Sequence, residues 1–313
     1  MVLFGMVAAW VSMGNNANIG SSSSNSSSSL IKSFNNIEDS LSIIPTGATY
    51  VRYSNLEADP LIGNFLNSYY WNTLPSYQIF DANASIDTLA IYPAEYFGDL
   101  QSTSAGSVIS LTDFDNATLN QSYSQINLNM NGNIIPMSKV YSNYYFTPKT
   151  SPVVSGTQNA VNYTLGAMAG YVNTAMADYS GLFNELNLKQ IPINNMTLET
   201  VGNNATFPIS SINLSINQFY AGMGPTNQTM VVNNTTYTKY SYTVILSVNQ
   251  TPSNSDAQYL YLLSSSNEKM GFEDYNVQLY DKYIVIQAHA PMVVCMNDMM
   301  TWGFMKYEAG ASQ

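Results

Sequence analysis

Short apolar runs separated by turn residues occupy most of the chain beyond residue 40 and predict a globular body of strands and helices. Residues 48–53 are rich in β-branched and aromatic side chains and follow a turn that contains Pro and Gly, a pattern typical of a strand. Asp59 and Pro60 fit the N-cap and the first turn of a helix. Apolar residues then recur at helical spacing over residues 61–69, which predicts that helix.

Two pairs of similar segments indicate an internal repeat. Residues 86–98 resemble residues 212–224, and residues 107–112 resemble residues 243–248. All four segments have the apolar, β-branched character of strands. Because the composition of the chain is biased, coincidental similarity is the alternative interpretation.

A polar segment of helical character follows each pair of predicted strands. It carries Tyr123 and Ile126 in the first copy, and Tyr259 and Leu262 in the second. We therefore expect a short helix at this point of both copies.

The most similar parts of the two copies come next in the chain. Tyr141 and Tyr144 enclose two polar residues, as in a tight hairpin, and residues 280–283 repeat this pattern. Pro152 and Pro291 follow the two turns, and each is expected to begin a helix.

The chain is predicted to be an α+β protein made of two similar units. Apolar residues at helical spacing predict a long helix over residues 160–188, with a break at residues 180–181, and residues 189–206 are expected to join the units. The units are predicted over residues 41–190 and 191–313. Each is expected to be an antiparallel sheet with helices packed on one face.

The N-terminal residues differ from the rest of the chain. Residues 1–13 contain no charged or strongly polar side chain. A bilayer span needs about 20 such residues and a signal-peptide core roughly 7–15, but the basic start of a signal peptide is missing. We interpret residues 1–14 as a membrane anchor helix or signal segment. Residues 15–40, rich in Ser and Asn, are expected to be a disordered tether.

Charged residues make up only 9% of the chain, against about 25% in an ordinary soluble domain. Asn, Ser, Thr and Tyr supply the polar surface instead, which suits an acidic exterior where carboxylates lose their charge. The formal net charge is −11 and no basic patch occurs, so nucleic acid is not an expected partner. We expect a protein anchored at the extracellular face of the cell membrane.

Asn-x-Ser/Thr sequons are frequent, and an extracellular body would allow N-glycosylation at them. Asn233 and Asn234 overlap, so at most one of the two is expected to be occupied. The candidate sites are Asn25, Asn83, Asn116, Asn120, Asn162, Asn195, Asn204, Asn213, Asn227, Asn233 and Asn249.

Residues 44–51 read Ile-Pro-x-x-Ala-x-Tyr-Val at the start of the body. With the N-terminal anchor and tether, this opening resembles a broad family of uncharacterised, membrane-anchored prokaryotic surface proteins with many archaeal members. The resemblance covers residues 44–66 and, more loosely, the two hairpin units. It implies a domain of unknown function at the cell surface, and it supplies no catalytic residues. The charge-poor composition also resembles that of extracellular proteins from acidophilic archaea.

The single histidine, His289, precedes a group of sulfur-containing residues. Thioether, thiolate and imidazole groups are ligands that suit Cu(I). At helical spacing, however, Met292, Cys295, Met296 and Met299 share one face, which is typical of a buried core stripe. A blue-copper site normally has two histidines, so we predict no metal site. A single cysteine also excludes an internal disulfide.

Paired carboxyl groups are the best enzymatic option, because acid hydrolysis needs only two positioned Asp or Glu residues. The chain has no Gly-x-Ser-x-Gly elbow, no Asp-Thr-Gly signature, no phosphate-binding loop and no zinc spacing. We therefore assign no catalytic residue and no cofactor. The candidates for a carboxylate pair are Asp81, Asp87, Glu95, Asp99, Asp113 and Asp115.

Aromatic residues offer a contact surface. Tyr69, Tyr70 and Trp71 form the densest cluster, and half-buried structural positions are the alternative explanation. The expected function is a non-enzymatic envelope protein with a binding or structural role. Its expected partners are the membrane, through the N-terminal segment, and envelope proteins or glycans. The alternative is a secreted, acid-stable hydrolase that uses a carboxylate pair.

Overall fold

The structure is a computed structural model that describes residues 30–69, 84–94, 96–98, 107–114, 119, 122–130, 133–141, 143–188, 190–191, 193, 195–203, 205–208 and 210–305.

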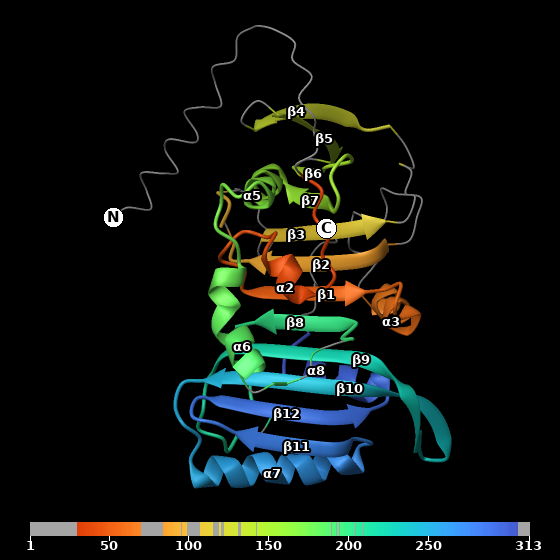
Figure 1. Cartoon of the computed structure of the whole chain (residues 1–313), viewed down its shortest axis with the longest axis vertical. Helices are drawn as coiled ribbons and strands as arrows, with labels where there is room; N and C mark the ends of the chain where they lie inside the picture. Colours follow the sequence, from red (N-terminus) through yellow and green to blue (C-terminus); the bar gives the residue numbers. More distant parts are fainter. Residues whose placement is uncertain are drawn as a thin grey trace, which may run out of the picture.

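Twelve strands form one continuous sheet along the molecule (Figure 1), and every neighbouring pair is antiparallel. The strand order is β11-β12-β10-β9-β8-β1-β2-β3-β7-β6-β5-β4. The strands are β1 (Tyr50–Asn55), β2 (Ala84–Tyr92), β3 (Ser107–Phe114), β4 (Ser124–Met130), β5 (Asn133–Tyr141), β6 (Tyr144–Phe146), β7 (Val153–Thr157), β8 (Leu198–Gly202), β9 (Ile216–Val232), β10 (Thr235–Val248), β11 (Glu273–Leu279) and β12 (Tyr283–Ala290).

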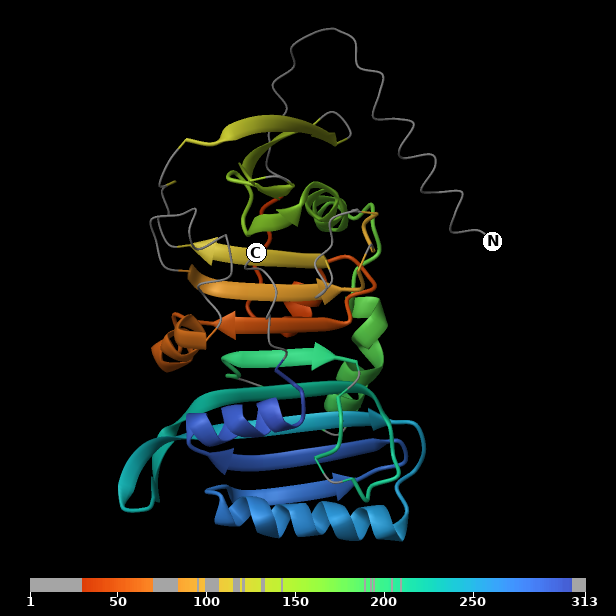
Figure 2. The ribbon, with the colours of Figure 1, turned by 180° about the vertical axis from the view of Figure 1, so that it is seen from behind.

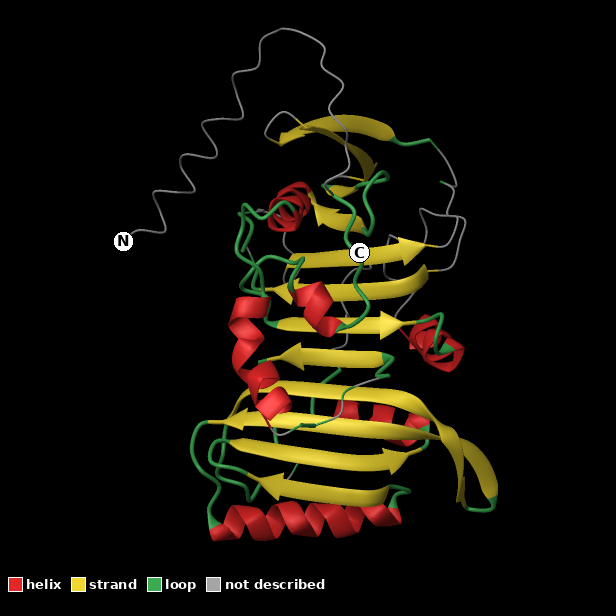
Figure 3. Cartoon of the chain, in the orientation of Figure 1, coloured by secondary structure: helices red, strands yellow, loops and turns green. Residues whose placement is uncertain are grey.

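Helices accompany the sheet, which confirms the predicted α+β class (Figure 3). They are α2 (Ile37–Leu41), α3 (Pro60–Tyr69), α5 (Gln158–Met168), α6 (Met176–Leu188), α7 (Asn254–Lys269) and α8 (Met292–Thr301).

The helices lie on both faces of the sheet. The prediction that the helices of each unit share one face is wrong for the first unit, because α3 packs into a different core from α5 and α6. In Figure 1, α2, α5 and α6 lie in front of the sheet, on what we call the α6 face. Helix α8 lies on the opposite face, the α8 face, which is turned toward the viewer in Figure 2. Helix α7 runs alongside β11 at one end of the sheet (Figure 1).

The central strands are buried on both faces, because each face carries its own hydrophobic core. In β1 the side chain of Tyr50 packs into the core on the α8 face, whereas Val51 and Tyr53 pack into the core on the α6 face. Successive side chains of a strand point to opposite faces, so one strand supplies both cores. The strand is buried along almost its whole length, including the polar residues Arg52 and Ser54, so it shows no simple alternation of buried and exposed positions.

The strand order is the same on the two sides of the β1–β8 pair. Going outward, one side is β1-β2-β3-β7-β6 and the other is β8-β9-β10-β12-β11. The two sides meet with Val51 opposite Val201. They differ in one connection. The β4–β5 hairpin lies between β3 and β6 on one side, and α7 lies between β10 and β11 on the other.

Part of the predicted repeat is wrong at the level of individual elements. Ile126 lies in strand β4, not in a helix, whereas Tyr259 and Leu262 do lie in helix α7. Pro291 is the N-cap of α8 as expected, but Pro152 precedes strand β7, and the following helix begins only at Gln158.

The predicted helix over residues 160–188 is two helices, α5 and α6. The interruption lies between Met168 and Met176, not at residues 180–181. Gly170 in this interruption has φ +79°, a backbone conformation that glycine adopts without steric cost.

Other local predictions are confirmed. The carboxylate of Asp59 accepts hydrogen bonds from the backbone N–H groups of Leu61 and Ile62, at 3.1 and 3.4 Å, and so caps α3. Tyr141 pairs with Tyr144 across the β5–β6 turn. The backbone N–H of Tyr280 likewise donates to the carbonyl of Tyr283, at 2.8 Å.

The globular body begins earlier than the predicted tether boundary at residue 40. Phe34 and Ile37 are buried in the core on the α6 face, and α2 starts at Ile37. Residues 1–29, which contain the predicted anchor and most of the predicted tether, lie outside the described residues. Within the described part of the chain, no helix combines the length and apolar character needed to span a bilayer.

Candidate functional site

A cavity of about 290 Å³ lies where β9 begins and β10 ends, beside α6 and the turn of the β11–β12 hairpin. Its volume is close to the lower limit of protein ligand pockets, roughly 300–1,000 Å³. The lining combines amide, hydroxyl, carboxylate, ammonium and phenol groups. The residues are Glu185, Asn217, Ser247, Val248, Asn249, Tyr280, Asp281, Lys282 and Tyr283.

Helix α6 forms one wall of the cavity and contributes Glu185. The side-chain Nε2 of Gln218 in β9 donates to the backbone carbonyl of Asp178, at 2.9 Å, and holds the helix against the sheet. A Cβ atom at position 181 would lie 3.8 Å from the hydroxyl of Tyr283, so this tyrosine reaches the helix one turn before Glu185. Packing against α6 therefore sets the position of one aromatic side chain of the lining.

The hairpin turn forms the opposite wall, and backbone hydrogen bonds fix it. The N–H of Tyr280 donates to the carbonyl of Tyr283, and the N–H of Val248 at the end of β10 donates to the carbonyl of Lys282, at 2.9 Å. The turn is thus attached both to itself and to the neighbouring strand. A turn held in this way presents its side chains at defined positions.

Side-chain hydrogen bonds orient two further groups of the lining. The hydroxyl of Thr251 donates to Oδ1 of Asp281, at 2.6 Å. The phenol of Tyr280 donates to Oε1 of Gln278, also at 2.6 Å. Each bond reduces the conformational freedom of a residue that lines the cavity.

The amide of Asn249 links the cavity to the segment before β9. Its Oδ1 accepts a hydrogen bond from the backbone N–H of Ser215, at 3.0 Å. The cavity as a whole offers donors and acceptors of hydrogen bonds beside two phenol rings, which suits a small polar ligand. Across the described residues, no three His, Cys, Asp or Glu side chains gather closely enough to hold a metal ion.

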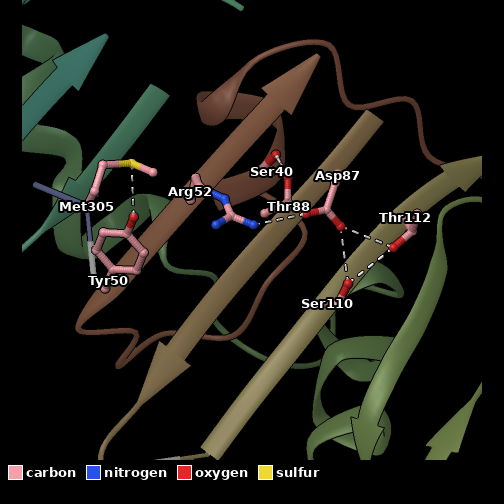
Figure 4. A network of polar contacts seen from close by, with 8 residues as sticks. All are labelled: Ser40, Tyr50, Arg52, Asp87, Thr88, Ser110, Thr112 and Met305. Carbon is pink, nitrogen blue, oxygen red and sulfur yellow. Dashed lines mark hydrogen bonds and ion pairs between the residues drawn. The ribbon is translucent and has the colours of Figure 1, made fainter. Parts of the chain in front are cut away.

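A second polar cluster is buried between β1, β2 and β3 (Figure 4). Nη2 of Arg52 lies 3.4 Å from Oδ2 of Asp87. Oδ1 of Asp87 accepts hydrogen bonds from the hydroxyls of Ser110 and Thr112, at 3.3 and 3.2 Å. The side chains of Arg52 and Asp87 are each only 1% exposed, so a solvent-borne substrate does not reach them. We assign this cluster to the stability of the sheet.

The described candidates for a carboxylate pair do not lie together. Asp87 bonds to Thr112 on one face of the sheet. Asp113 is the next residue of β3, so its side chain points to the opposite face. The remaining candidates lie outside the described residues: Asp81, Glu95, Asp99 and Asp115.

Two buried acids have perturbed pKa values. Glu199 in β8 is 2% exposed, and burial raises its pKa to about 7, although hydrogen bonds from Tyr220 and from the N–H of Ile37 oppose this shift. Burial likewise raises the pKa of Asp298 in α8 to about 6, against the effect of a hydrogen bond from Tyr242. Both acids lie away from the cavity lining and are therefore linked to stability rather than to the candidate site.

The sulfur-containing residues of α8 occupy the positions expected of a core stripe. Cys295, Met296 and Met299 are fully buried, and Met292 is partly buried against the same core. Burial, followed by the charge of Asp298, raises the pKa of the Cys295 thiol. His289 is in β12, with Nδ1 3.3 Å from Oδ2 of Asp274.

The candidate glycosylation sites are distributed unevenly. Asn162 is half-buried in α5, whereas Asn195, Asn213, Asn227, Asn233, Asn234 and Asn249 are exposed. Asn233 and Asn234 form the turn between β9 and β10, with φ of 50° and 62°. The others lie outside the described residues: Asn25, Asn83, Asn116, Asn120 and Asn204.

Most of the predicted aromatic contact surface lies outside the described residues. Tyr69 ends α3, and Tyr70 and Trp71 lie outside the described residues. A different aromatic cluster contains Tyr96, Phe97 and Tyr163, with ring centroids 4.9 Å apart between Tyr96 and Phe97 and 5.5 Å apart between Phe97 and Tyr163. The sequence does not predict this cluster, because Tyr163 in α5 is distant along the chain from the adjacent residues Tyr96 and Phe97.

No protein-family model and no curated protein matches the chain. A solved structure of TP0453, in crystal form I, is similar over 85% of this chain and 97% of its own, with a TM-score of 0.48 and 10% sequence identity. Crystal form III of TP0453 is similar over 83% of this chain and 97% of its own, with a TM-score of 0.46 and 10% identity. Structural similarity at this level indicates no function for the chain.

Proposed function

We propose that this chain is an envelope protein, anchored at the extracellular face of the membrane, that binds a small polar ligand in the cavity between α6 and the β11–β12 turn. The cavity is the observation that carries the proposal. It joins Glu185 of the first predicted unit to Asp281 and Tyr283 of the second. A ligand between the two units fits the binding role expected from the sequence.

Attachment to the membrane is assigned to residues 1–14, and residues 15–29 are the proposed tether. The apolar and Ser-rich compositions of these segments support this assignment. The low content of charged residues supports an extracellular, acidic setting. Exposed sequons, such as Asn227 on β9, are the proposed positions of N-linked glycans.

Duplication of an ancestral unit is part of the proposal. The shared order of five strands on each side of the β1–β8 pair supports it. In this order β2 takes the same place as β9, and β3 takes the same place as β10. This correspondence agrees with the similar segments in the sequence. The similarity of the two hairpins does not follow this order. Residues 280–283 join β11 to β12, which take the places of β6 and β7, whereas residues 141–144 join β5 to β6.

A second candidate function is a hydrolase that uses a carboxylate pair. The observation that favours it is that Glu185 and Asp281 line the same cavity. Glycoside hydrolysis requires two carboxyl groups about 5–10 Å apart on either side of the scissile bond. Release of product from a chromogenic substrate, lost in Glu185→Gln, would decide for this candidate.

Binding is tested with the full chain and two matched variants. Asn217→Trp fills the mouth of the cavity, whereas Asn276→Trp adds the same side chain at an exposed position of β11. The probes are a panel of sugars, amino acids and nucleosides, measured by ligand-observed NMR. We expect one class to bind the parent chain and Asn276→Trp but not Asn217→Trp. Absence of binding by every class would contradict the proposal.

Attachment is tested by flotation with phosphatidylcholine vesicles. The full chain is expected to float with the vesicles, and a chain that lacks residues 1–14 is expected to remain in the dense fraction. Equal behaviour of the two chains would contradict the assigned anchor.

A further inference from the structure

We propose that the ligand of the cavity is an uncharged sugar ring, presented at the end of a glycan. This inference rests on the proposed binding function and names the chemical class of its ligand. The groups of the cavity lining, their charges and the size of the cavity lead to it.

The hydrogen-bonding groups of the lining match a ligand rich in hydroxyls. Asn217 and Asn249 each present a planar amide with donors and acceptors, and Ser247 adds a hydroxyl. Glu185 and Asp281 add carboxylate acceptors. A sugar hydroxyl donates and accepts at once, so it can bond to each of these groups, whereas a mainly apolar ligand would leave them unpaired at a cost.

The two tyrosines provide the apolar part of sugar recognition. Tyr280 and Tyr283 are partly buried against the core on the α6 face, so their rings are supported from behind. The hydrogen bond from the phenol of Tyr280 to Gln278 further restricts that ring. A flat, restrained aromatic surface suits the C–H face of a pyranose ring and loses little side-chain entropy on binding.

The charges of the lining select against an anionic ligand. Lys282 is the only cationic side chain among the lining residues, and Glu185 and Asp281 are both acidic. The whole chain carries a formal net charge of −11, which adds to the repulsion of anions. A phosphate or uronic acid is therefore disfavoured relative to a neutral sugar of the same shape.

The size of the cavity limits the ligand to about one ring. Its volume of about 290 Å³ is close to the smallest ligand pockets. Asn217, Asn249, Asp281 and Lys282 are exposed at its rim, so a chain attached to the bound ring can extend into solvent. This arrangement fits the terminal residue of a glycan better than a free nucleoside or a long polymer.

The test uses the full chain and six sugars of the same ring size. Saturation-transfer NMR is measured with glucose, glucuronic acid and glucosamine, and then with galactose, mannose and N-acetylglucosamine. We expect a neutral sugar to bind with a Kd of about 1 mM. Glucuronic acid is expected to bind about tenfold more weakly than glucose.

Variants locate the binding. Asn217→Ala and Glu185→Gln are expected to weaken sugar binding about fivefold or more, whereas Asn276→Ala on β11 serves as the unchanged control. Equal melting temperatures show that each variant is folded. If sugar binding is the same in Asn217→Ala, Glu185→Gln and the parent, the sugar binds elsewhere and the inference is wrong.

The outcomes separate this inference from the proposed function. Binding of an amino acid or nucleoside, lost in Asn217→Trp, with no binding of neutral sugars, would overturn the sugar assignment and retain the binding site. Failure of every probe would overturn both. Hydrolysis of a neutral glycoside, lost in Glu185→Gln, would support the sugar assignment and move the protein to the hydrolase alternative.

Discussion

Glu199 in β8 accepts a hydrogen bond from the backbone N–H of Ile37, 3.1 Å away, and so connects residues separated by 162 positions in the sequence. Its other carboxyl oxygen accepts a hydrogen bond from the phenol of Tyr220, at 2.9 Å. Ile37 begins α2, the first helix of the described chain. The carboxyl group thus holds this helix to the strands at the centre of the sheet.

The first prediction is that the protein becomes more stable as the pH falls from about 7 to about 4. The folded pKa of Glu199 is about 7 and that of Asp298 about 6, both above their usual values because of burial. The unfolded chain therefore loses these protons at lower pH than the folded chain. The free energy of unfolding falls as the pH rises through this range, on the order of 3 kcal/mol for each group.

Urea unfolding at pH 4.5 and pH 7.5 measures this dependence. Glu199→Gln keeps the shape of the side chain without its titration and is expected to reduce the difference between the two pH values. Glu57→Gln, at an exposed position, is the matched control and should leave the difference unchanged. Equal stability of the parent chain at both pH values would contradict the prediction. Acid stability of this kind agrees with the extracellular, acidic setting proposed for the chain.

The second prediction concerns the buried ion pair in Figure 4. Arg52→Met leaves the carboxylate of Asp87 buried beside an apolar side chain and is expected to cost about 3–5 kcal/mol of unfolding free energy. The double variant Arg52→Met/Asp87→Leu removes both charges and should recover much of this loss. Denaturant unfolding of the two variants gives the values. A single variant as stable as the parent would show that the pair contributes nothing.

The positions of several elements could be predicted from the sequence, because local patterns determine them. Helix α3 and its Asp59 cap follow directly from spacing and capping chemistry. The repeat predicts a helix where the structure has strand β4, and Ile126, Leu128 and Met130 alternate with polar residues as in a half-exposed strand. The helical character holds for α7 alone, because the corresponding part of the other half forms the β4–β5 hairpin.

The candidate site could be predicted only in part. The sequence pattern predicts the hairpin turn that carries Tyr280 and Tyr283, but nothing local indicates that Glu185 of α6 lines the same cavity. That juxtaposition depends on strand order, which is set by long-range pairs such as Val51 with Val201. Two cores on opposite faces also hide the period-2 signal of the central strands.

The third prediction uses the single cysteine as a reporter of α8. Because Cys295 is fully buried and its thiol pKa is raised, we expect no reaction with a thiol reagent in the folded protein and full reaction after unfolding. Ser255→Cys introduces an exposed thiol at the start of α7 and should react at once. Rapid labelling of Cys295 in the parent chain would contradict its position in the core.

The fourth prediction concerns glycan occupancy. Asn227 and one of the turn residues Asn233 and Asn234 are exposed on the β9–β10 ribbon, so they are expected to carry glycans in an N-glycosylating host. Asn249 is expected to be unmodified, because its Oδ1 is hydrogen-bonded to Ser215 and its side chain lines the cavity. Mass spectrometry of proteolytic peptides measures each site. A glycan at Asn249 would contradict the use of the cavity for a free ligand.

The fifth prediction compares the same substitution at two glycines. A Cβ at Gly224 in β9 would collide with the backbone carbonyl of Asn195, which is part of the segment leading into β8. Gly224→Ala is therefore expected to destabilise the protein by about 1–3 kcal/mol, because the backbone must move.

At Gly63 in α3 the nearest atom to a new Cβ, in Leu56, is 3.9 Å away, which is an ordinary van der Waals contact. Gly63→Ala should instead stabilise by about 0.5–1 kcal/mol, since alanine favours the helix. Urea unfolding measures both effects. Equal effects at the two sites would show that the close approach of Gly224 to Asn195 does not constrain the segment leading into β8.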